Sequence, residues 1–306
     1  MQQPIRILFV DDEERILRSL ALQFRRQFEV LTEVNPLRVL QRLQEQPVDI
    51  IVSDQRMPQM SGSQLLAQVQ ERHPQTLRIL LTGYSDLDAA VEALNSGGIF
   101  RYLTKPWDQV AMAQTLQQAA RLVEARRTCA VLEQPPQPDS LQQPILLLLD
   151  SDGETREMTR QLCEQTGIRM QTANDLPSAV QLLNQQTPDI LVSDIQLAGQ
   201  DLRPLLMGLA QAHPRLLSII VTPFQDTQVL LKLINQAQIF RYLPKPVRRG
   251  MLERALRTAA QQSQRWQHSP AQAVPREAEA PMDAEEQSRI GNLLGMLGRL
   301  RQRLIA

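Results

Sequence analysis

Short runs of apolar residues alternate along this 306-residue chain with segments whose apolar positions recur every three or four residues. The runs are typical of buried parallel strands, and the spaced segments are typical of amphipathic helices. In about the first 130 residues the predicted strands are 5–10, 28–31, 50–52, 77–81 and 99–103. The predicted helices are 16–24, 36–44, 63–72, 86–95 and 108–127. This alternation predicts an α/β fold with a doubly wound parallel sheet.

The second half of the chain repeats the first at an offset of 140 positions. Val-Ser-Asp at 52–54 recurs at 192–194, and Ile-Phe-Arg-Tyr-Leu at 99–103 recurs unchanged at 239–243. Because the period has the size of a domain, the repeat indicates a duplicated domain and not a solenoid.

Two stretches have the composition of linkers. Residues 134–144 are polar and proline-rich, and residues 266–283 are rich in proline, alanine and glutamate. They predict domains at 1–133 and 145–265, followed by a final segment at 284–306.

Polar residues follow four of the predicted strands in the first domain. Asp11 and Asp12 follow the first strand, Asp54 the third, Thr82 the fourth and Lys105 the fifth. The carboxyl ends of parallel strands form one edge of the sheet, where such folds place their ligands. Clustered carboxylates favour a hard divalent cation, and we expect Mg²⁺. A lysine and a threonine beside them are suited to holding phosphoryl oxygens.

Four segments resemble the receiver domain of two-component response regulators. They are Phe-Val-Asp-Asp-Glu at 9–13, Ser-Asp-Gln-Arg-Met-Pro at 53–58, Leu-Thr-Gly at 81–83 and Tyr-Leu-Thr-Lys-Pro-Trp at 102–107. The resemblance covers the first domain and, through the repeat, the second. It implies two flavodoxin-like (βα)5 domains in tandem.

The resemblance also implies roles for these residues. Asp54 would accept a phosphoryl group from a sensor histidine kinase or a phosphotransfer protein. Asp12 would bind Mg²⁺ directly and Asp11 largely through water. Asp54 and the backbone carbonyl of Arg56 would complete the metal site. Such a protein would not be an enzyme beyond self-phosphorylation and slow self-dephosphorylation of an aspartate.

Four further residues would respond to the phosphoryl group. Lys105 would pair with the acceptor carboxylate and then with a phosphoryl oxygen. The Thr82 hydroxyl and the Gly83 backbone N–H would bind the other oxygens. Tyr102 stands at the position of the family's aromatic switch, which turns inward once the threonine is drawn to phosphate. These changes would alter the face formed by 86–95, 99–103 and 108–127.

The second copy keeps the residues Asp194, Thr222, Tyr242 and Lys245. Its acidic pair is broken, because the run after the strand reads Asp150-Ser151-Asp152. Under the constant offset Ser151 replaces Asp11; if the strand ends one residue earlier, Ser151 replaces the direct ligand Asp12. The sequence alone leaves both registers open.

Pro223 stands where the first copy has Gly83, and proline has no backbone N–H to donate. The loss of this donor and of one carboxylate predicts a degenerate second site. We therefore expect the second domain to be a pseudo-receiver.

The final segment has the pattern of an amphipathic helix. Ile290, Leu293, Leu297, Leu300 and Leu304 fall at a and d spacing over two heptads. Its glycines make it marginal as an isolated helix, so we expect it to order against a partner. The alternatives are a second copy in a homodimer, a downstream protein client, an anionic surface, or its own second domain.

Composition narrows the class of protein. Lysine plus arginine equals aspartate plus glutamate at 33 each, so no overall field favours nucleic acid or an anionic membrane. Cys129 and Cys163 are predicted to be reduced thiols. No apolar run approaches the roughly 20 residues of a membrane span, and no signal peptide is evident. We expect a cytoplasmic protein without a nucleic-acid-binding domain.

Three functions from different classes follow. The first is a phosphorylation-switched regulator of protein contacts. The second is a constitutive adaptor made of two non-switching modules. The third is a small phosphate-ester hydrolase that uses the same acidic pocket.

Overall fold

The computed structural model describes residues 3–83, 91–92, 94–95, 98–131, 143–223, 226–268, 278, 287–291 and 295. The chain divides into two compact units, residues 1–128 and residues 129–306.

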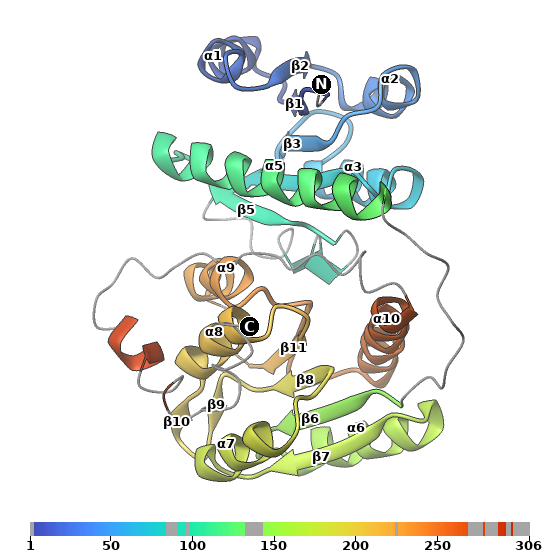
Figure 1. The fold of residues 1–306 in the computed structure, drawn as a ribbon, viewed down its shortest axis with the longest axis vertical. Helices are drawn as coiled ribbons and strands as arrows, with labels where there is room; N and C mark the ends of the chain where they lie inside the picture. Colours follow the sequence, from blue (N-terminus) through green and yellow to red (C-terminus); the bar gives the residue numbers. More distant parts are fainter. Residues whose placement is uncertain are drawn as a thin grey trace. The chain divides into compact units, whose positions relative to one another are not determined.

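The first unit is built on a five-stranded parallel sheet (Figure 1). The strand order is β2-β1-β3-β4-β5, so β1 lies between β2 and β3. The strands are β1 (Arg6–Val10), β2 (Glu29–Glu33), β3 (Ile50–Asp54), β4 (Leu77–Thr82) and β5 (Arg101–Thr104). Every residue of β3 and β4 is buried, because helices cover both faces of the sheet.

The helices of the first unit follow the predicted pattern with one subdivision. They are α1 (Glu14–Phe24), α2 (Val39–Glu45), α3 (Gly62–Arg72) and α5 (Gln109–Val131). The predicted helix at 36–44 begins as a separate 3-10 turn, η1 (Pro36–Arg38), because the Asn35 side chain accepts a hydrogen bond from the Leu37 N–H. Of the predicted helix at 86–95, only residues 91, 92, 94 and 95 are among those described.

The second unit has the same sheet topology, with the strand order β12-β11-β8-β6-β7. Its parallel strands are β6 (Ile145–Leu149), β7 (Arg169–Ala173), β8 (Ile190–Ser193), β11 (Leu217–Thr222) and β12 (Arg241–Pro244). Its helices are α6 (Gly153–Thr166), α7 (Leu176–Gln185), α8 (Arg203–Ala212), α9 (Thr227–Gln236) and α10 (Arg249–His268). The predicted tandem of two flavodoxin-like domains is confirmed.

The second unit also contains a hairpin that the sequence did not predict. The antiparallel strands β9 (Gln196–Leu197) and β10 (Gln200–Asp201) lie between β8 and α8. Ala198 and Gly199 have positive φ angles of 50° and 79°, which form the tight connection. In the first unit the corresponding loop contains Met57 and Pro58.

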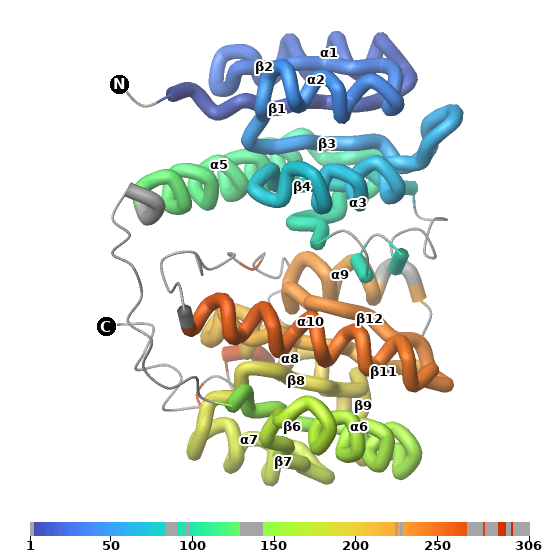
Figure 2. Tube along the Cα trace, turned by 90° about the vertical axis from the view of Figure 1, so that its right-hand side faces the viewer, coloured from blue at the N-terminus to red at the C-terminus, as the bar shows by residue number. Residues whose placement is uncertain are grey.

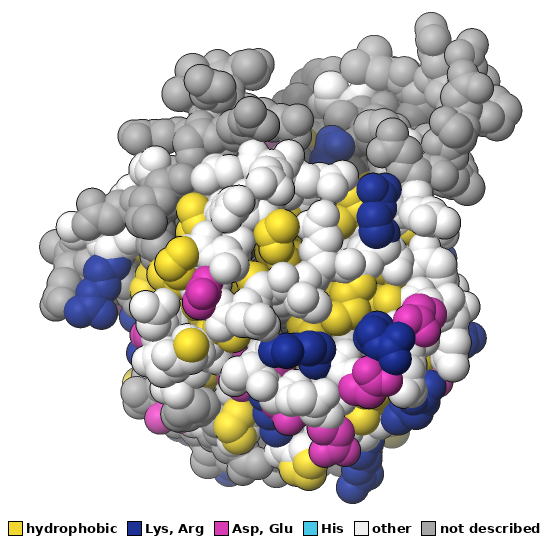
Figure 3. All heavy atoms as spheres, turned by 90° about the horizontal axis from the view of Figure 1, so that it is seen from below, with side chains coloured by type: hydrophobic (Ala, Val, Ile, Leu, Met, Phe, Trp, Pro, Cys, Tyr) yellow, Lys and Arg dark blue, Asp and Glu magenta, His cyan; other side chains and the backbone are white. Residues whose placement is uncertain are grey.

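The face seen in Figure 3 carries charges of both signs. Lysine, arginine and acidic side chains lie there among hydrophobic ones, with no large patch of a single sign. This mixture agrees with the equal totals of basic and acidic residues in the chain. Among the described residues, no helix is both long and apolar enough to cross a membrane.

Candidate functional site

The predicted acidic residues of the first unit lie together at one edge of its sheet. Asp11 directly follows β1, and Asp54 is the last residue of the neighbouring strand β3. One carboxylate oxygen from each of Asp11, Asp12 and Asp54 lies within 4.8 Å of the others. Asp11 and Asp54 are buried, whereas Asp12 is exposed and leaves the cluster open to solvent. A set of hard oxygen donors open to water on one side fits Mg²⁺.

Lys105 bridges the two buried carboxylates. Its Nζ lies 3.0 Å from Asp11 Oδ2 and 2.7 Å from Asp54 Oδ1. Burial raises the pKa of Asp54, although the hydrogen bond and charge of Lys105 oppose this rise. Burial alone would lower the pKa of Lys105, but the two carboxylates raise it above its usual value. The lysine therefore remains an ammonium at neutral pH.

The other predicted residues of the first site occupy the neighbouring strand ends. Thr82 ends β4, is 1% exposed and accepts a backbone hydrogen bond from the Lys105 N–H at 2.8 Å through its carbonyl. Gly83 follows it and is partly buried. Tyr102, in the middle of β5, is also 1% exposed, so its side chain is buried. Arg56 lies in the loop after β3 with its side chain exposed.

The loop that follows Asp54 depends on residues that the sequence analysis did not select. Gln55 accepts a hydrogen bond from the Ser63 N–H through Oε1 at 3.0 Å. The Gly62 N–H donates to the Gln55 carbonyl at 3.1 Å. A Cβ atom on Gly62 would lie 2.0 Å from the carbonyl oxygen of Asp54, so only glycine fits there.

The sequence does contain a local signal for the start of α3. Ser61 and Gln64 form a capping box, in which each side chain accepts from the other residue's backbone N–H. The Ser-x-x-Gln spacing is typical of a helix N-terminus. No comparable pattern reveals the close approach of Gly62 to Asp54.

The structure resolves the register of the second site. Leu8 of β1 pairs with Ile51, whereas Leu147 of β6 pairs with Leu191. The offset between the copies is therefore 139 in the first strand of each unit and 140 in the third. Asp150 consequently occupies the place of Asp11.

Ser151 then stands where the first unit has Asp12. A serine hydroxyl replaces the exposed carboxylate, which is the one expected to bind the metal directly. The other register, in which Asp152 keeps that role, is wrong.

Lys245 bridges the two remaining carboxylates of the second site. Its Nζ donates to Asp150 Oδ1 at 2.9 Å and to Asp194 Oδ2 at 2.8 Å. Burial raises the pKa of Asp150, and the Lys245 hydrogen bond opposes the rise. Within the described part of the chain, the other Asp150 oxygen, Oδ2, is buried without a hydrogen-bond partner. Thr222 and Tyr242 are 1% and 3% exposed, as buried as Thr82 and Tyr102.

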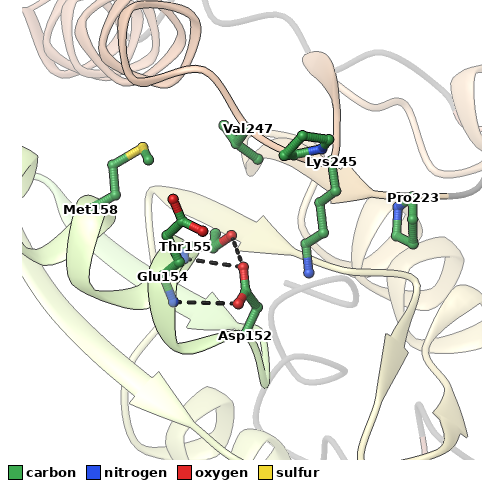
Figure 4. A pocket seen from close by; sticks show the side chains of 8 residues that line it. Asp152, Glu154, Thr155, Met158, Pro223, Lys245 and Val247 are labelled. Atoms are coloured by element: carbon green, nitrogen blue, oxygen red, sulfur yellow. Dashed lines mark hydrogen bonds between the residues drawn. The ribbon is translucent and has the colours of Figure 1, made fainter.

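Asp152 caps the helix α6 and does not join this carboxylate pair (Figure 4). Its side chain accepts hydrogen bonds from the backbone N–H groups of Glu154 at 3.3 Å and Thr155 at 3.1 Å. The Thr155 hydroxyl also donates to it, and this bond is the main cause of its lowered pKa. Asp152, Glu154 and Thr155 line a pocket of about 330 Å³, and Lys245 also projects into it.

Replacing Asp152 with alanine should lower the free energy of unfolding of the second unit by about 1 kcal/mol at pH 7, the usual effect of losing an N-cap. A carboxylate whose pKa is lowered by folding stabilises the fold above its unfolded pKa and loses this effect as the pH falls through its folded pKa. The difference between wild type and variant should therefore shrink below pH 4. Urea titrations at pH 7 and pH 3 would measure it. An equal difference at both pH values would contradict the capping role.

Pro223 follows β11 as Gly83 follows β4. Proline has no N–H, so a phosphoryl oxygen at this position would lack one backbone donor. The second site thus keeps a lysine, a threonine and two carboxylates but has lost one carboxylate and one N–H. Among the described residues, the group of three acidic side chains suited to a metal lies in the first unit.

Comparison with known proteins agrees with this geometry. A sequence profile of the response regulator receiver domain matches residues 7–117 and 146–257. The chain is 37% identical over 113 residues to the hydrogenase transcriptional regulatory protein HoxA of Cupriavidus necator, which is 37% of this chain and 23% of HoxA. It is 40% identical over 108 residues to the DNA-binding transcriptional regulator NtrC of Escherichia coli K12, which is 35% of this chain and 21% of NtrC. The match thus spans about a quarter of these curated relatives.

A solved structure is similar to one of the two domains. It is the signal receiver domain of an HD domain-containing protein from Pseudomonas fluorescens Pf-5, with 36% sequence identity and a TM-score of 0.40. The match covers 42% of this chain and 95% of that structure.

Proposed function

Because this chain belongs to the response regulator receiver domain family and carries the domain twice, we propose that it is a two-component response regulator phosphorylated on Asp54. The supporting observation is the cluster of side chains around Asp54, where two further carboxylates and Lys105 meet at the end of one sheet. The phosphoryl donor would be a sensor histidine kinase or a phosphotransfer protein.

The proposed reaction forms an acyl phosphate. A carboxylate oxygen of Asp54 attacks the phosphorus, a new O–P bond forms, and the P–N bond to the donor histidine breaks. The histidine nitrogen takes a proton from solvent. Mg²⁺ held by Asp11, Asp12, Asp54 and the Arg56 carbonyl would neutralise the charge on the transferring group. Lys105, Thr82 and Gly83 are placed to hold its oxygens.

The second domain would act without phosphorylation. Ser151 and Pro223 remove a metal ligand and an oxygen donor, and Lys245 already neutralises one of the two carboxylates. We infer that it is a pseudo-receiver that serves as a binding module. The chain would then not be an enzyme acting on free substrates, and its output would be a phosphorylation-dependent protein contact.

The full chain with Mg²⁺ and acetyl phosphate should gain the mass of one phosphoryl group. Peptide mass spectrometry should locate it on Asp54, because among the described residues only that carboxylate has the complete set of surrounding groups. Asp54→Asn should abolish the labelling, and EDTA should do the same. Asp194→Asn is the matched control and should be labelled as the wild type is.

Three outcomes would contradict the proposal. Label that persists in Asp54→Asn would place the acceptor elsewhere. A chain that takes no label from any donor, yet keeps its partner contacts in Asp54→Asn, would be the constitutive adaptor. Sustained turnover of small phosphate esters would instead support the hydrolase.

A further inference from the structure

The helix α8 is buried except at Arg203 and Gln211, which are partly exposed, whereas its counterpart in the first unit is more open. The counterpart α3 exposes Gln64 and Arg72 and leaves Ala67, Gln68 and Gln70 partly exposed. At the equivalent positions α8 has Pro204, Ala212, Met207, Gly208 and Ala210, all of them buried. Four polar positions of one copy have thus become small or apolar in the other, and the alanine at 67 has become Met207. Something covers the outer face of α8.

Met207 marks that outer face. At 100° per residue, it lies about 160° from Leu205 and Leu209 and about 100° from Leu206. These three leucines occupy the positions of the sheet-facing residues Leu65, Leu66 and Val69 of α3. A side chain directed away from the sheet is expected to contact water, yet Met207 is only 1% exposed. The helix α9 is a further neighbour of α8.

A short helical segment at residues 287–291 lies next to this face. In Figures 1 and 2 it is the red segment beside α8, and it belongs to the same compact unit. Ile290 is 3% exposed, whereas the residues on either side of it are exposed. Among the described residues of this segment, Ile290 is thus the buried one.

A charge pair lies at the entrance to α8. Burial alone would raise the pKa of Asp201, but hydrogen bonds from Arg203 and the positive charges of Arg203 and Arg289 lower it. Asp201 is the last residue of the hairpin β9–β10 and stands two positions before the first turn of α8. Arg289 is thus close to the start of α8, the helix that contains the buried Met207.

We propose that the C-terminal segment docks in cis on the outer face of α8, with Ile290 as its apolar anchor and Arg289 facing Asp201. The face that is polar and exposed on α3 is apolar on α8, where it forms a binding site for the chain's own C-terminal segment. A homodimer through this segment is disfavoured, because Ile290, the first residue of its apolar seam, is already buried within one chain.

Ile290→Asp in the full chain tests this docking. The variant should release the segment, so hydrogen peroxide should oxidise Met207 on the order of ten times faster than in the wild type. Removing residues 284–306 should have the same effect. The matched control is Leu22→Asp, which places the same charge on a side chain that is already 62% exposed in the first unit. It should leave Met207 protected.

Two further measurements keep the test decisive. Cys163 is 2% exposed, and burial raises the pKa of its thiol to about 12, so iodoacetamide should modify it only if the second unit unfolds. Light scattering should give a monomer before and after the change. Met207 that stays protected in both variants would overturn the proposal. Concentration-dependent protection with a dimer mass would show docking in trans, which would overturn it as well.

Discussion

Gly62→Ala is expected to abolish most phosphorylation of Asp54 and to lower the free energy of unfolding of the first domain by about 3 kcal/mol. The added Cβ would lie 2.0 Å from the Asp54 carbonyl oxygen and 2.8 Å from Leu80 Cδ1. A backbone carbonyl at the end of a buried strand cannot rotate away as a side chain can. The loop after β3 must therefore move, and Asp54 must move with it.

The expected loss of labelling is large because the chemistry depends on position. A displacement of about 1 Å can slow a reaction on the order of a hundredfold. Lys105 Nζ lies 2.7 Å from Asp54 Oδ1, so a shift of that size would break their contact. The rate of acetyl phosphate labelling and a urea titration would measure the two effects.

Gly153→Ala is the matched control for Gly62→Ala. Nothing lies within 4 Å of a Cβ at Gly153, which is the first residue of α6. The same addition of one methyl group should therefore leave labelling and stability near those of the wild type. If Gly62→Ala behaved like this control, the close contact with Asp54 would not constrain the site.

Ser151→Asp combined with Pro223→Gly is expected to confer phosphorylation on the second domain. The first change restores the missing carboxylate beside Asp150 and Asp194, and the second restores a backbone N–H. Each charge-assisted hydrogen bond contributes roughly 1.5–3 kcal/mol, which corresponds to a rate factor of about 10 to 150. The gain should be visible as a new label on Asp194.

This gain is best measured in an Asp54→Asn background, where the first domain contributes no label. The matched control replaces Ser151→Asp with Ser151→Asn, which adds similar bulk without the charge. That control should remain unlabelled with Pro223→Gly present. Label on Asp194 before either substitution would contradict the assignment of the second domain as a pseudo-receiver.

The sequence was sufficient for the fold and for most of the first site. Alternating apolar runs and helical patterns determine a parallel sheet, and the carboxyl ends of its strands bring Asp11, Asp54 and Lys105 together. These predictions succeed because burial of apolar strands dominates the folding energy and because the site lies where the strands end. The helix at 86–95 lies mostly outside the described residues and stays a prediction. The domain boundaries and residue roles also remain predictions.

Other features depend on contacts that no local pattern encodes. The register of Ser151 depends on how β6 pairs with β8, and a one-residue change in strand length reverses the choice. The close approach of Gly62 to Asp54 is a property of the folded loop. The proposed cover of Met207 comes from a segment that includes Ile290, 83 positions further along the chain. A pattern within one helix could not reveal it.

The bridge from Lys245 to two carboxylates has a consequence for how each half senses its surroundings. Around Asp54 three acidic side chains face one ammonium, so two negative charges remain to be balanced by ions from the medium. Around Asp194 only one remains, and the lysine contacts both acids. We therefore expect the first half of the chain to respond to the ionic composition of its environment, whereas Lys245 balances half of the acidic charge in the second site.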